Sequence, residues 1–413
     1  MEVKIIKGTK QIGGCITEIT VNNSKIIIDF GYDLEENNES FELEGLTKGK
    51  SIYDAVFITH SHGDHIGLIN KINKDIPVYV EKSTLRIHNL TCDFCGKEKV
   101  NRNINTFEIK ELTKRENKED RCIFDNGNIK VYPYMGDHSS YNSCMFLVEC
   151  DGKKLLHTGD FRMHGRRNAV IKISLKKIGK VDMLITEGTT LTRCNDKYMS
   201  EAELEDKAVE IMKKYNQVLV MQSSTNFDRT ASFMGASIKS EKKFILDLFS
   251  YYLQEEISNR FLKVDNFNVY LWKPFRYNYK PDWFKEKYMD IDNNLLGAFP
   301  YYTMEVKESM LDDIKMLHKK GLLNDACLIY SMWEGYIDKE EKLNRFMQKL
   351  KDMNIEIINL HTSGHADKTA FKDLNKMVSP NQTIIIHTED GSKGKEIFNN
   401  VISVKDNESI VIE

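Results

Sequence analysis

The stretch THSHGDHIG, residues 59–67, places three histidines and one aspartate within six positions, directly after the apolar run 55–58. Imidazole nitrogens and carboxylate oxygens hold zinc and similar divalent ions in proteins. His60 and His62 are two residues apart on an extended segment, so both can face one ion, whereas Asp64 and His65 can face a neighbouring ion. The stretch therefore predicts the start of a site for two metal ions, whose remaining ligands must come from elsewhere in the chain.

Three further segments place a metal-binding type of residue at the end of a predicted strand, where rigid scaffolds carry catalytic groups. They are GDHSSYNSC with His138, LLHTGDF with Asp160 and TIIIHTEDG with His387. Any one such residue is more often a structural hydrogen-bonding group, but the whole set favours a dinuclear site. The predicted ligands are His60, His62, Asp64, His65, His138, Asp160 and His387. We expect two divalent ions, Zn²⁺ first and Mn²⁺ as the alternative.

Length and composition predict a globular α/β protein with more than one domain. The chain has 413 residues, of which 41% are hydrophobic and 29% charged. Strand-like runs dominate the first half, and from about residue 200 strands alternate with helical stretches, a pattern typical of parallel sheets. The net charge of -3 excludes nucleic-acid binding through overall charge and leaves a local basic groove as the route. No leader or long apolar stretch is evident, so we expect a cytoplasmic protein without a membrane span.

The order and context of the metal-type residues resemble the metallo-β-lactamase fold, an αββα sandwich with its metals at one edge of the two sheets. The resemblance implies that the first ion is held by His60, His62 and His138. It implies that the second ion is held by Asp64, His65 and His387, and that Asp160 bridges the two. This fold carries many activities, so the fold alone predicts no function.

Motifs in the second half narrow the resemblance to the β-CASP nucleases, and within them to ribonuclease J. TEGTT presents Glu187, and an unbroken block from residue 361 to 389 carries His365 and His387. These three residues match the family's motifs A, B and C. The resemblance implies a βαβ-rich β-CASP domain at 189–353, inserted into a metallo-β-lactamase domain made of 1–188 and 354–413. No counterpart of ribonuclease J's additional C-terminal domain is expected, because little sequence follows His387.

The resemblance implies a nuclease that hydrolyses phosphodiester bonds of single-stranded RNA and leaves 5′-phosphate products. Two neighbouring ions can activate water and stabilise charge on the entering and leaving oxygens. We expect Asp64, Glu187 and His365 to be the catalytic residues. Glu187 would accept a hydrogen bond from a ligand imidazole. His365 would protonate the leaving 3′-oxygen or hold the scissile phosphate.

Two turns ahead of predicted helices are candidates for binding substrate phosphates through backbone N–H groups. Helix capping is the alternative interpretation of both turns. The candidate residues are Ser223, Ser224, His361, Ser363 and Gly364. The segment 270–284 mixes basic and aromatic residues suited to base stacking, although core packing is the favoured alternative there.

Several questions stay open at this level. DNA is the alternative substrate, and a small-molecule hydrolase acting on thiolesters or cyclic nucleotides, or a catalytically silent RNA-binding protein, are the alternative functions. Exonuclease or endonuclease action is undecided, as is the oligomeric state, with a homodimer as one option. Cys92 and Cys95, with His88 and Cys122, could form a structural zinc site, but only one pair has the spacing of zinc ligands.

Overall fold

The computed structural model of the chain describes residues 1–34, 41–193, 197–257, 269–272, 290–291 and 296–412. The chain forms two compact units, and the second interrupts the first. Unit 1 comprises Met1–Tyr198 and Gly364–Glu413, and unit 2 comprises Met199–Ser363. Segment 270–284, the proposed basic and aromatic stretch, lies outside the described residues except for 270–272. No described helix combines the length and the apolar composition needed to cross a bilayer.

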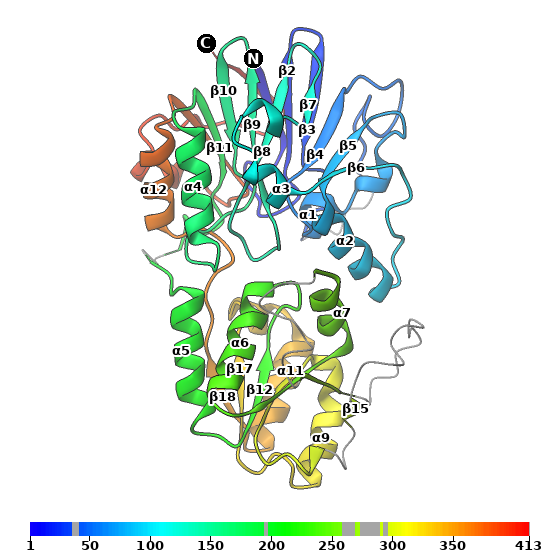
Figure 1. Cartoon of the computed structure of the whole chain (residues 1–413), viewed down its shortest axis with the longest axis vertical. Coiled ribbons are helices and arrows are strands. Elements are labelled where there is room, and N and C mark those ends of the chain that lie inside the picture. The colour runs from blue at the N-terminus through cyan, green and yellow to red at the C-terminus, as the bar shows by residue number, and fades with distance from the viewer. Residues whose placement is uncertain (35–40, 194–196, 258–268, 273–289, 292–295, 413) are drawn as a thin grey trace. The chain divides into compact units, whose positions relative to one another are not determined.

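Unit 1 is built around two sheets (Figure 1). The seven-stranded sheet has the order β20 (Glu408–Val411), β1 (Glu2–Lys7), β2 (Ile16–Val21), β3 (Ser24–Ile28), β4 (Ala55–Ile58), β5 (Val78–Glu81) and β6 (Asn105–Phe107). The six-stranded sheet has the order β19 (Gln382–Ile386), β11 (Met183–Glu187), β10 (Lys153–His157), β9 (Cys144–Cys150), β8 (Lys130–Met135) and β7 (Phe124–Asp125).

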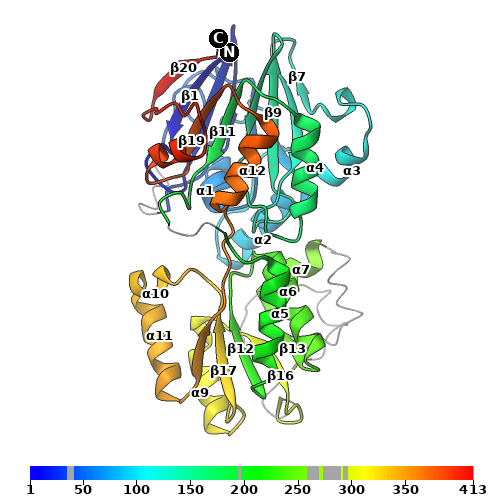
Figure 2. The same ribbon diagram turned by 90° about the vertical axis from the view of Figure 1, so that its left-hand side faces the viewer.

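The described helices of unit 1 are α1 (Gly63–Ile66), α2 (Lys82–Phe94), α3 (Ile109–Lys114), α4 (Asn168–Ile178) and α12 (Lys368–Val378), with short 3-10 helices at Ile69–Lys71, Glu119–Arg121 and Gly391–Glu396. α1 and α2 cover the outer face of the seven-stranded sheet, and α4 and α12 cover that of the six-stranded sheet, whereas Ile109 of α3 packs in the core between the sheets. Figures 1 and 2 show α4 and α12 side by side. Both pack against the six-stranded sheet, where Leu175 and Phe371 share a buried cluster with Leu156. The two sheets between helical layers confirm the predicted αββα sandwich.

The run AVFI of β4 shows why the chain folds this way ahead of its histidine-rich stretch. Successive side chains of a strand point to opposite faces. Ala55 and Phe57 therefore enter the core between the two sheets, and Val56 and Ile58 pack under α1 on the outer face. With both faces buried, the strand holds the residues that follow it at a fixed place on the sheet edge.

Unit 2 is a seven-stranded sheet in which every strand pair is parallel, as the alternating pattern predicts. The strand order is β15 (Asp290–Ile291), β14 (Val269–Trp272), β13 (Lys243–Leu246), β16 (Tyr302–Glu305), β12 (Gln217–Met221), β17 (Ala326–Tyr330) and β18 (Glu356–Asn359). The helices are α5 (Glu201–Met212), α6 (Phe227–Lys239), α7 (Leu248–Ile257), α9 (Leu311–Lys319), α10 (Gly335–Lys339) and α11 (Glu341–Asp352), with a 3-10 helix at Glu308–Met310.

The helices of unit 2 pack on the sheet in two groups. Leu317 of α9 and Phe346 of α11 share one core with Met304 of β16. The next residue back along that strand, Thr303, contacts Met212 of α5 on the other face. Figure 2 shows α5 beside α6, and a capping box of Ser200 and Glu203 begins α5.

The boundaries of the two units differ from the predicted domain limits of 189 and 353. Residues 189–198 belong to unit 1, where Thr190 bonds the backbone oxygen of Ala366. The strand after Asn354, which the sequence-based limits assign to the returning part of the first domain, is β18. It pairs with β17 in the sheet of unit 2. Its apolar residues indicate a buried strand, but they do not indicate which sheet it joins.

Candidate metal centre

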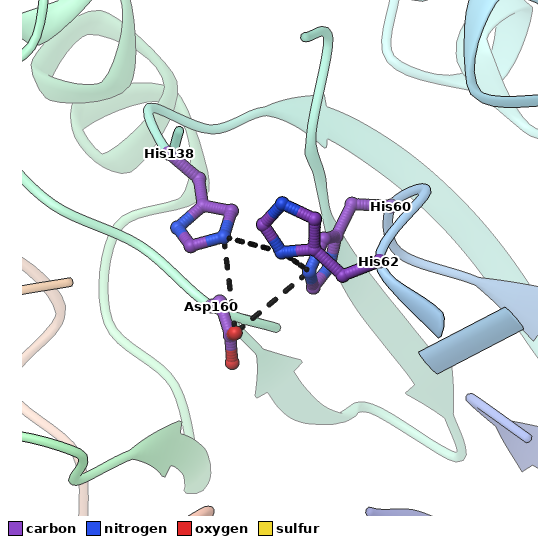
Figure 3. Close-up of side chains that lie close together, drawn as sticks. All are labelled: His60, His62, His138 and Asp160. Carbon is purple, nitrogen blue, oxygen red and sulfur yellow. Dashed lines mark hydrogen bonds and ion pairs between the residues drawn. The ribbon is translucent and has the colours of Figure 1, made fainter. Parts of the chain in front are cut away.

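Four of the predicted ligands converge at one edge of unit 1 (Figure 3). Nε2 of His60 lies 3.1 Å from Nδ1 of His62, and Nε2 of His138 lies 3.2 Å from the same atom. Oδ2 of Asp160 lies 3.7 Å from the His60 nitrogen and 3.8 Å from the His138 nitrogen. An ion with tetrahedral bonds of about 2.0–2.1 Å has ligand atoms about 3.3 Å apart, so this group fits one such ion.

A second group forms beside the first and shares the same carboxylate. Nε2 of His387 lies 3.1 Å from Oδ2 of Asp64, and Nε2 of His65 lies 3.5 Å from that oxygen. Oδ2 of Asp160 is 3.4 Å from the His65 nitrogen and 3.7 Å from the His387 nitrogen. One oxygen of Asp160 therefore lies close to donors of both groups, the position required of a bridging ligand.

The donor set fits a divalent cation. Nε2 of His65 is buried and makes no hydrogen bond, a state that normally carries a free-energy penalty of about 1–3 kcal/mol. The atom faces the carboxylates of Asp64 and Asp160. Imidazoles and carboxylates converging in this way are the ligands that zinc and manganese use.

The ring nitrogen opposite the centre has its own partner in four of the histidines. Nδ1 of His65 lies 2.8 Å from Oδ2 of Asp29, and Nδ1 of His60 lies 2.9 Å from the hydroxyl of Thr59. Nδ1 of His138 donates to the backbone oxygen of Gly364 at 2.7 Å. Nδ1 of His387 lies 2.8 Å from the hydroxyl of Thr189. Such partners fix the tautomer and the ring orientation, leaving Nε2 free to bind a metal.

Sequence reasoning missed Asp29, Thr59 and Thr189. Asp29 follows the apolar strand β3, and this is the same signal that singled out Asp160 and His387. The hydroxyl residues carry no comparable signal, because threonine is common at strand ends.

Asp29 and His387, which both lie at the centre, have strained backbones. Asp29 has φ 62° and His387 has φ 51°, in the left-handed region that non-glycine residues seldom adopt. Strain of this kind concentrates at functional sites, where the surroundings enforce it. The chain also approaches α1 closely at Gly31, where an added Cβ would lie 1.9 Å from the carbonyl carbon of Asp64. Glycine at this position lets the loop after β3 reach the centre.

Burial and local charge set the protonation of the centre. Burial lowers the pKa of His62 to about 4. Burial alone would raise the pKa of Asp160, but the imidazoles of His387 and His65 hold it well below its usual value. Burial alone would lower the pKa of His65, but the carboxylates of Asp160 and Asp64 hold it well above its usual value. Ionised carboxylates beside a histidine that carries a proton indicate that a cation entering this group would displace that proton.

Glu187 and His365 lie next to the centre, but the partners of Glu187 differ from the expected imidazole of a ligand. Its carboxylate accepts the backbone N–H of Thr189 at 2.9 Å and that of Ala366 at 3.1 Å. The nearest imidazole is His365, whose Nδ1 lies 3.5 Å from Glu187 and 3.8 Å from Asp160. The side chain of His365 is 22% exposed, so it can reach a substrate. Glu187 therefore holds two backbone segments, the turn after β11 through Thr189 and the segment before α12 through Ala366.

The predicted phosphate-binding residues are divided between the units. Ser224 is buried and its hydroxyl donates to Glu305 at 3.3 Å, so that hydroxyl already has a partner inside unit 2. Ser223 bonds to Thr225, and Asn226 caps α6, so capping explains part of this turn. His361 and Ser363 end unit 2. Gly364 belongs to unit 1 and holds His138 through its carbonyl.

The cysteine motif is not among the metal-type clusters of the described residues. Sγ of Cys92 lies 3.6 Å from Nε2 of His88, Cys95 is exposed, and Cys122 donates to the carbonyl oxygen of Phe124. The structural zinc site therefore stays an untested alternative.

Two family models match the chain. A "Beta-lactamase superfamily domain" covers residues 24–221, and a "Zn-dependent metallo-hydrolase RNA specificity domain" covers residues 351–395. The first contains six of the seven predicted ligands and the second contains His387.

Curated relatives share low identity over much of the chain. Ribonuclease J of Corynebacterium glutamicum is 23% identical, covering 63% of this chain and 36% of that protein. Ribonuclease J 2 of Streptococcus pyogenes is 20% identical, covering 59% and 45%. The Integrator complex subunit 11 homolog of Dictyostelium discoideum is 21% identical, covering 95% and 58%. The chain thus spans less than two thirds of the length of each of these relatives.

A solved structure matches almost the whole fold. The crystal structure of a protein of unknown function from Enterococcus faecalis V583 has a TM-score of 0.78 and 20% identity, covering 99% of both chains. At this identity, the match shows a shared fold that includes both units.

Proposed function

Because this chain is a member of the β-CASP branch of the metallo-β-lactamase superfamily, we propose that it is a dinuclear-metal-dependent nuclease that hydrolyses single-stranded RNA to 5′-phosphate products. The observation that carries the proposal is the place of Asp160. Its Oδ2 lies within 3.8 Å of donors from both histidine groups. A carboxylate shared in this way could help to hold two divalent ions in one site, where they would supply Lewis-acid chemistry.

The proposed ions are zinc, with manganese as the alternative, and the matched zinc-dependent model supports that choice. Bound there, they would supply Lewis-acid activation of water and stabilisation of the charge that develops on the phosphate oxygens. Asp64 would act as a catalytic residue by completing the second group through its contact with His387.

His365 is the proposed proton donor to the leaving 3′-oxygen. It is the imidazole beside the centre that is partly exposed, and its Nδ1 faces Asp160 and Glu187. An imidazole within reach of the leaving oxygen is the commonest general acid in enzymes. Glu187 would support this role by holding the N–H of Ala366, the residue that follows His365.

RNA is the proposed substrate because the matched specificity model and the relatives named as ribonucleases concern RNA. Ser223, His361, Ser363 and Gly364 remain the proposed phosphate contacts, and Ser224 becomes the weakest of the set because it bonds to Glu305. A homodimer stays a prediction, which sedimentation would test.

The test is cleavage of 5′-labelled and 3′-labelled single-stranded RNA and DNA, with zinc or manganese, by wild type and by the Asp64→Ala, His65→Ala double variant. Wild type should cleave RNA, and the double variant should lose at least about 10³-fold in rate, since both changes remove groups that converge on the centre. The product ladder shows whether cleavage proceeds from an end or within the chain. Equal cleavage by both proteins would refute the proposal.

Two further arms test the alternatives. Faster turnover of single-stranded DNA than RNA would reassign the substrate while keeping the chemistry. Turnover of a thiolester or a cyclic nucleotide, with no oligonucleotide cleavage, would instead assign a small-molecule hydrolase.

A further inference from the structure

Thr189 occupies a junction between the two histidines of the C-terminal motifs. Its hydroxyl lies 2.8 Å from Nδ1 of His387 and 3.2 Å from Nδ1 of His365. The same hydroxyl lies 3.3 Å from the backbone oxygen of His387. Thr189 is 4% exposed, so water does not compete freely for these contacts.

We propose that Thr189 is a positioning residue that fixes the tautomer and the orientation of His387 and thereby completes the second metal group. The importance of this role for catalysis rests on the proposed function, whereas the effect of Thr189 on metal binding does not depend on it. Thr189 itself touches neither the predicted ion nor the scissile bond, and it acts through His387.

The two ring nitrogens of His387 face different partners. Nε2 lies 3.1 Å from Oδ2 of Asp64 and 3.7 Å from that of Asp160, so it faces the centre. A metal-binding nitrogen must offer a lone pair, and a neutral imidazole then carries its proton on Nδ1. The acceptor at Nδ1 is the hydroxyl oxygen of Thr189. Without that oxygen, the Nδ1–H tautomer loses its hydrogen bond and is no longer favoured over the Nε2–H tautomer.

The backbone of His387 is strained. Its φ of 51° lies in the left-handed region, which costs a non-glycine residue free energy unless its surroundings hold it there. Its N–H donates to the backbone oxygen of Gly8 at 2.8 Å, and its carbonyl lies within reach of the Thr189 hydroxyl. Thr189 therefore contacts both the ring and the carbonyl of a residue that would otherwise relax.

The hydroxyl is itself held in place. The N–H of Thr189 donates to Glu187, and the next residue, Thr190, bonds the carbonyl of Ala366. The turn is tight, because a Cβ at Gly188 would lie 2.6 Å from the side chain of Ile385. Glu187 thus reaches the metal group indirectly, by fixing the residue that orients His387.

The test uses Thr189→Ala, Thr189→Val and Thr189→Ser, with the exposed Thr192→Ala as the matched control. Zinc binding to metal-free protein is measured by titration calorimetry, and bound zinc is counted after dialysis. The alanine and valine variants should bind the second zinc about 10–100-fold more weakly. Serine keeps the hydroxyl and should restore binding to within a few-fold of wild type, and Thr192→Ala should match wild type. Valine keeps the side-chain shape, which guards against a folding failure of the alanine variant.

A second readout needs no metal. In metal-free wild type the ¹⁵N resonance of Nδ1 of His387 should be that of a protonated, hydrogen-bonded nitrogen, and Thr189→Val should shift it towards an unprotonated nitrogen, while Nε2 keeps its hydrogen bond with Asp64. Wild-type zinc affinity together with unchanged ring resonances in Thr189→Val would overturn the proposal. If the nuclease proposal is wrong, RNA is not cleaved, but the zinc affinities and the ring resonances still change as expected.

Discussion

Nδ1 of His65 lies 2.8 Å from Oδ2 of Asp29, and both side chains are buried. The same carboxylate accepts the N–H of Thr59 at 2.7 Å, and the hydroxyl of Thr59 lies 2.9 Å from Nδ1 of His60. Asp29 therefore orients one histidine of each metal group, directly in one case and through a threonine in the other.

Asp29→Asn should weaken zinc binding by about 10–100-fold. The amide can keep one acceptor for Thr59, but its NH₂ group would then face Nδ1 of His65 and oppose the Nδ1–H tautomer. Competition with a chromogenic chelator measures the affinity. Asp54→Asn is the control, because Asp54 accepts a backbone N–H from Lys25 and has no contact with a predicted ligand. Wild-type affinity in Asp29→Asn would contradict the predicted role.

Glu187→Gln should lower the rate of RNA cleavage by about 10–100-fold while both zinc ions stay bound. The glutamine has one acceptor oxygen, so one of the two N–H groups, of Thr189 or Ala366, loses its partner. Cleavage rate and zinc content are measured on the same preparation, with the exposed Glu389→Gln as control. Loss of zinc from Glu187→Gln would contradict this prediction and would show that the contact of Glu187 with Thr189 is needed for metal binding.

The fold and the convergence of the proposed ligands could be predicted because their signals are local. The run before His60 buries both of its faces, and each distant ligand sits beside a strand of the same kind. The partners of the ligands were less predictable. Asp29 reaches His65 across 36 positions, and Thr189 reaches His387 across 198. Such pairs depend on which strand ends meet, and a single sequence does not specify this.

The same limit explains where unit 2 differs from the sequence-based predictions. A serine ahead of a helix can bind a phosphate or bond inward, and Ser224 bonds to Glu305, 81 positions later. The apolar strand β18 could have completed either sheet, and its pairing with β17 decided the domain boundary. The local sequence predicts each helix and strand, but which elements lie next to one another is decided by tertiary contacts.

Arg162→Met should destabilise unit 1 by about 3–5 kcal/mol, because it removes a buried guanidinium from the buried carboxylate of Asp137. Nε of Arg162 lies 3.4 Å from Asp137, and neither side chain is exposed. Urea unfolding measures the loss. Lys172→Met is the control, since its pair with Asp373 at 3.5 Å is exposed and should contribute less than about 1 kcal/mol. Equal effects of the two substitutions would show that the buried pair contributes no more than a surface pair.

Glu305 should make unit 2 less stable as the pH rises. Burial and the nearby carboxylate of Asp247 together raise its pKa to about 8, against the opposing effects of Lys307 and the hydroxyls of Ser250 and Ser224. The folded chain therefore keeps a proton that an unfolded glutamate releases near pH 4.5. The stabilisation that the protonated Glu305 gives the folded state is fully present below pH 4.5, and it is lost as the pH rises towards 8.

Glu305→Gln should remove this dependence, because the neutral amide resembles the protonated acid at every pH. The midpoint of thermal unfolding of wild type should fall between pH 5 and pH 8 more steeply than that of the variant. At pH 8 the variant should be the more stable protein. Glu210→Gln, at an exposed position of α5, should follow wild type throughout. Parallel curves for wild type and Glu305→Gln would show that Glu305 is already ionised in the folded protein, with Lys307 as the cation that compensates its charge.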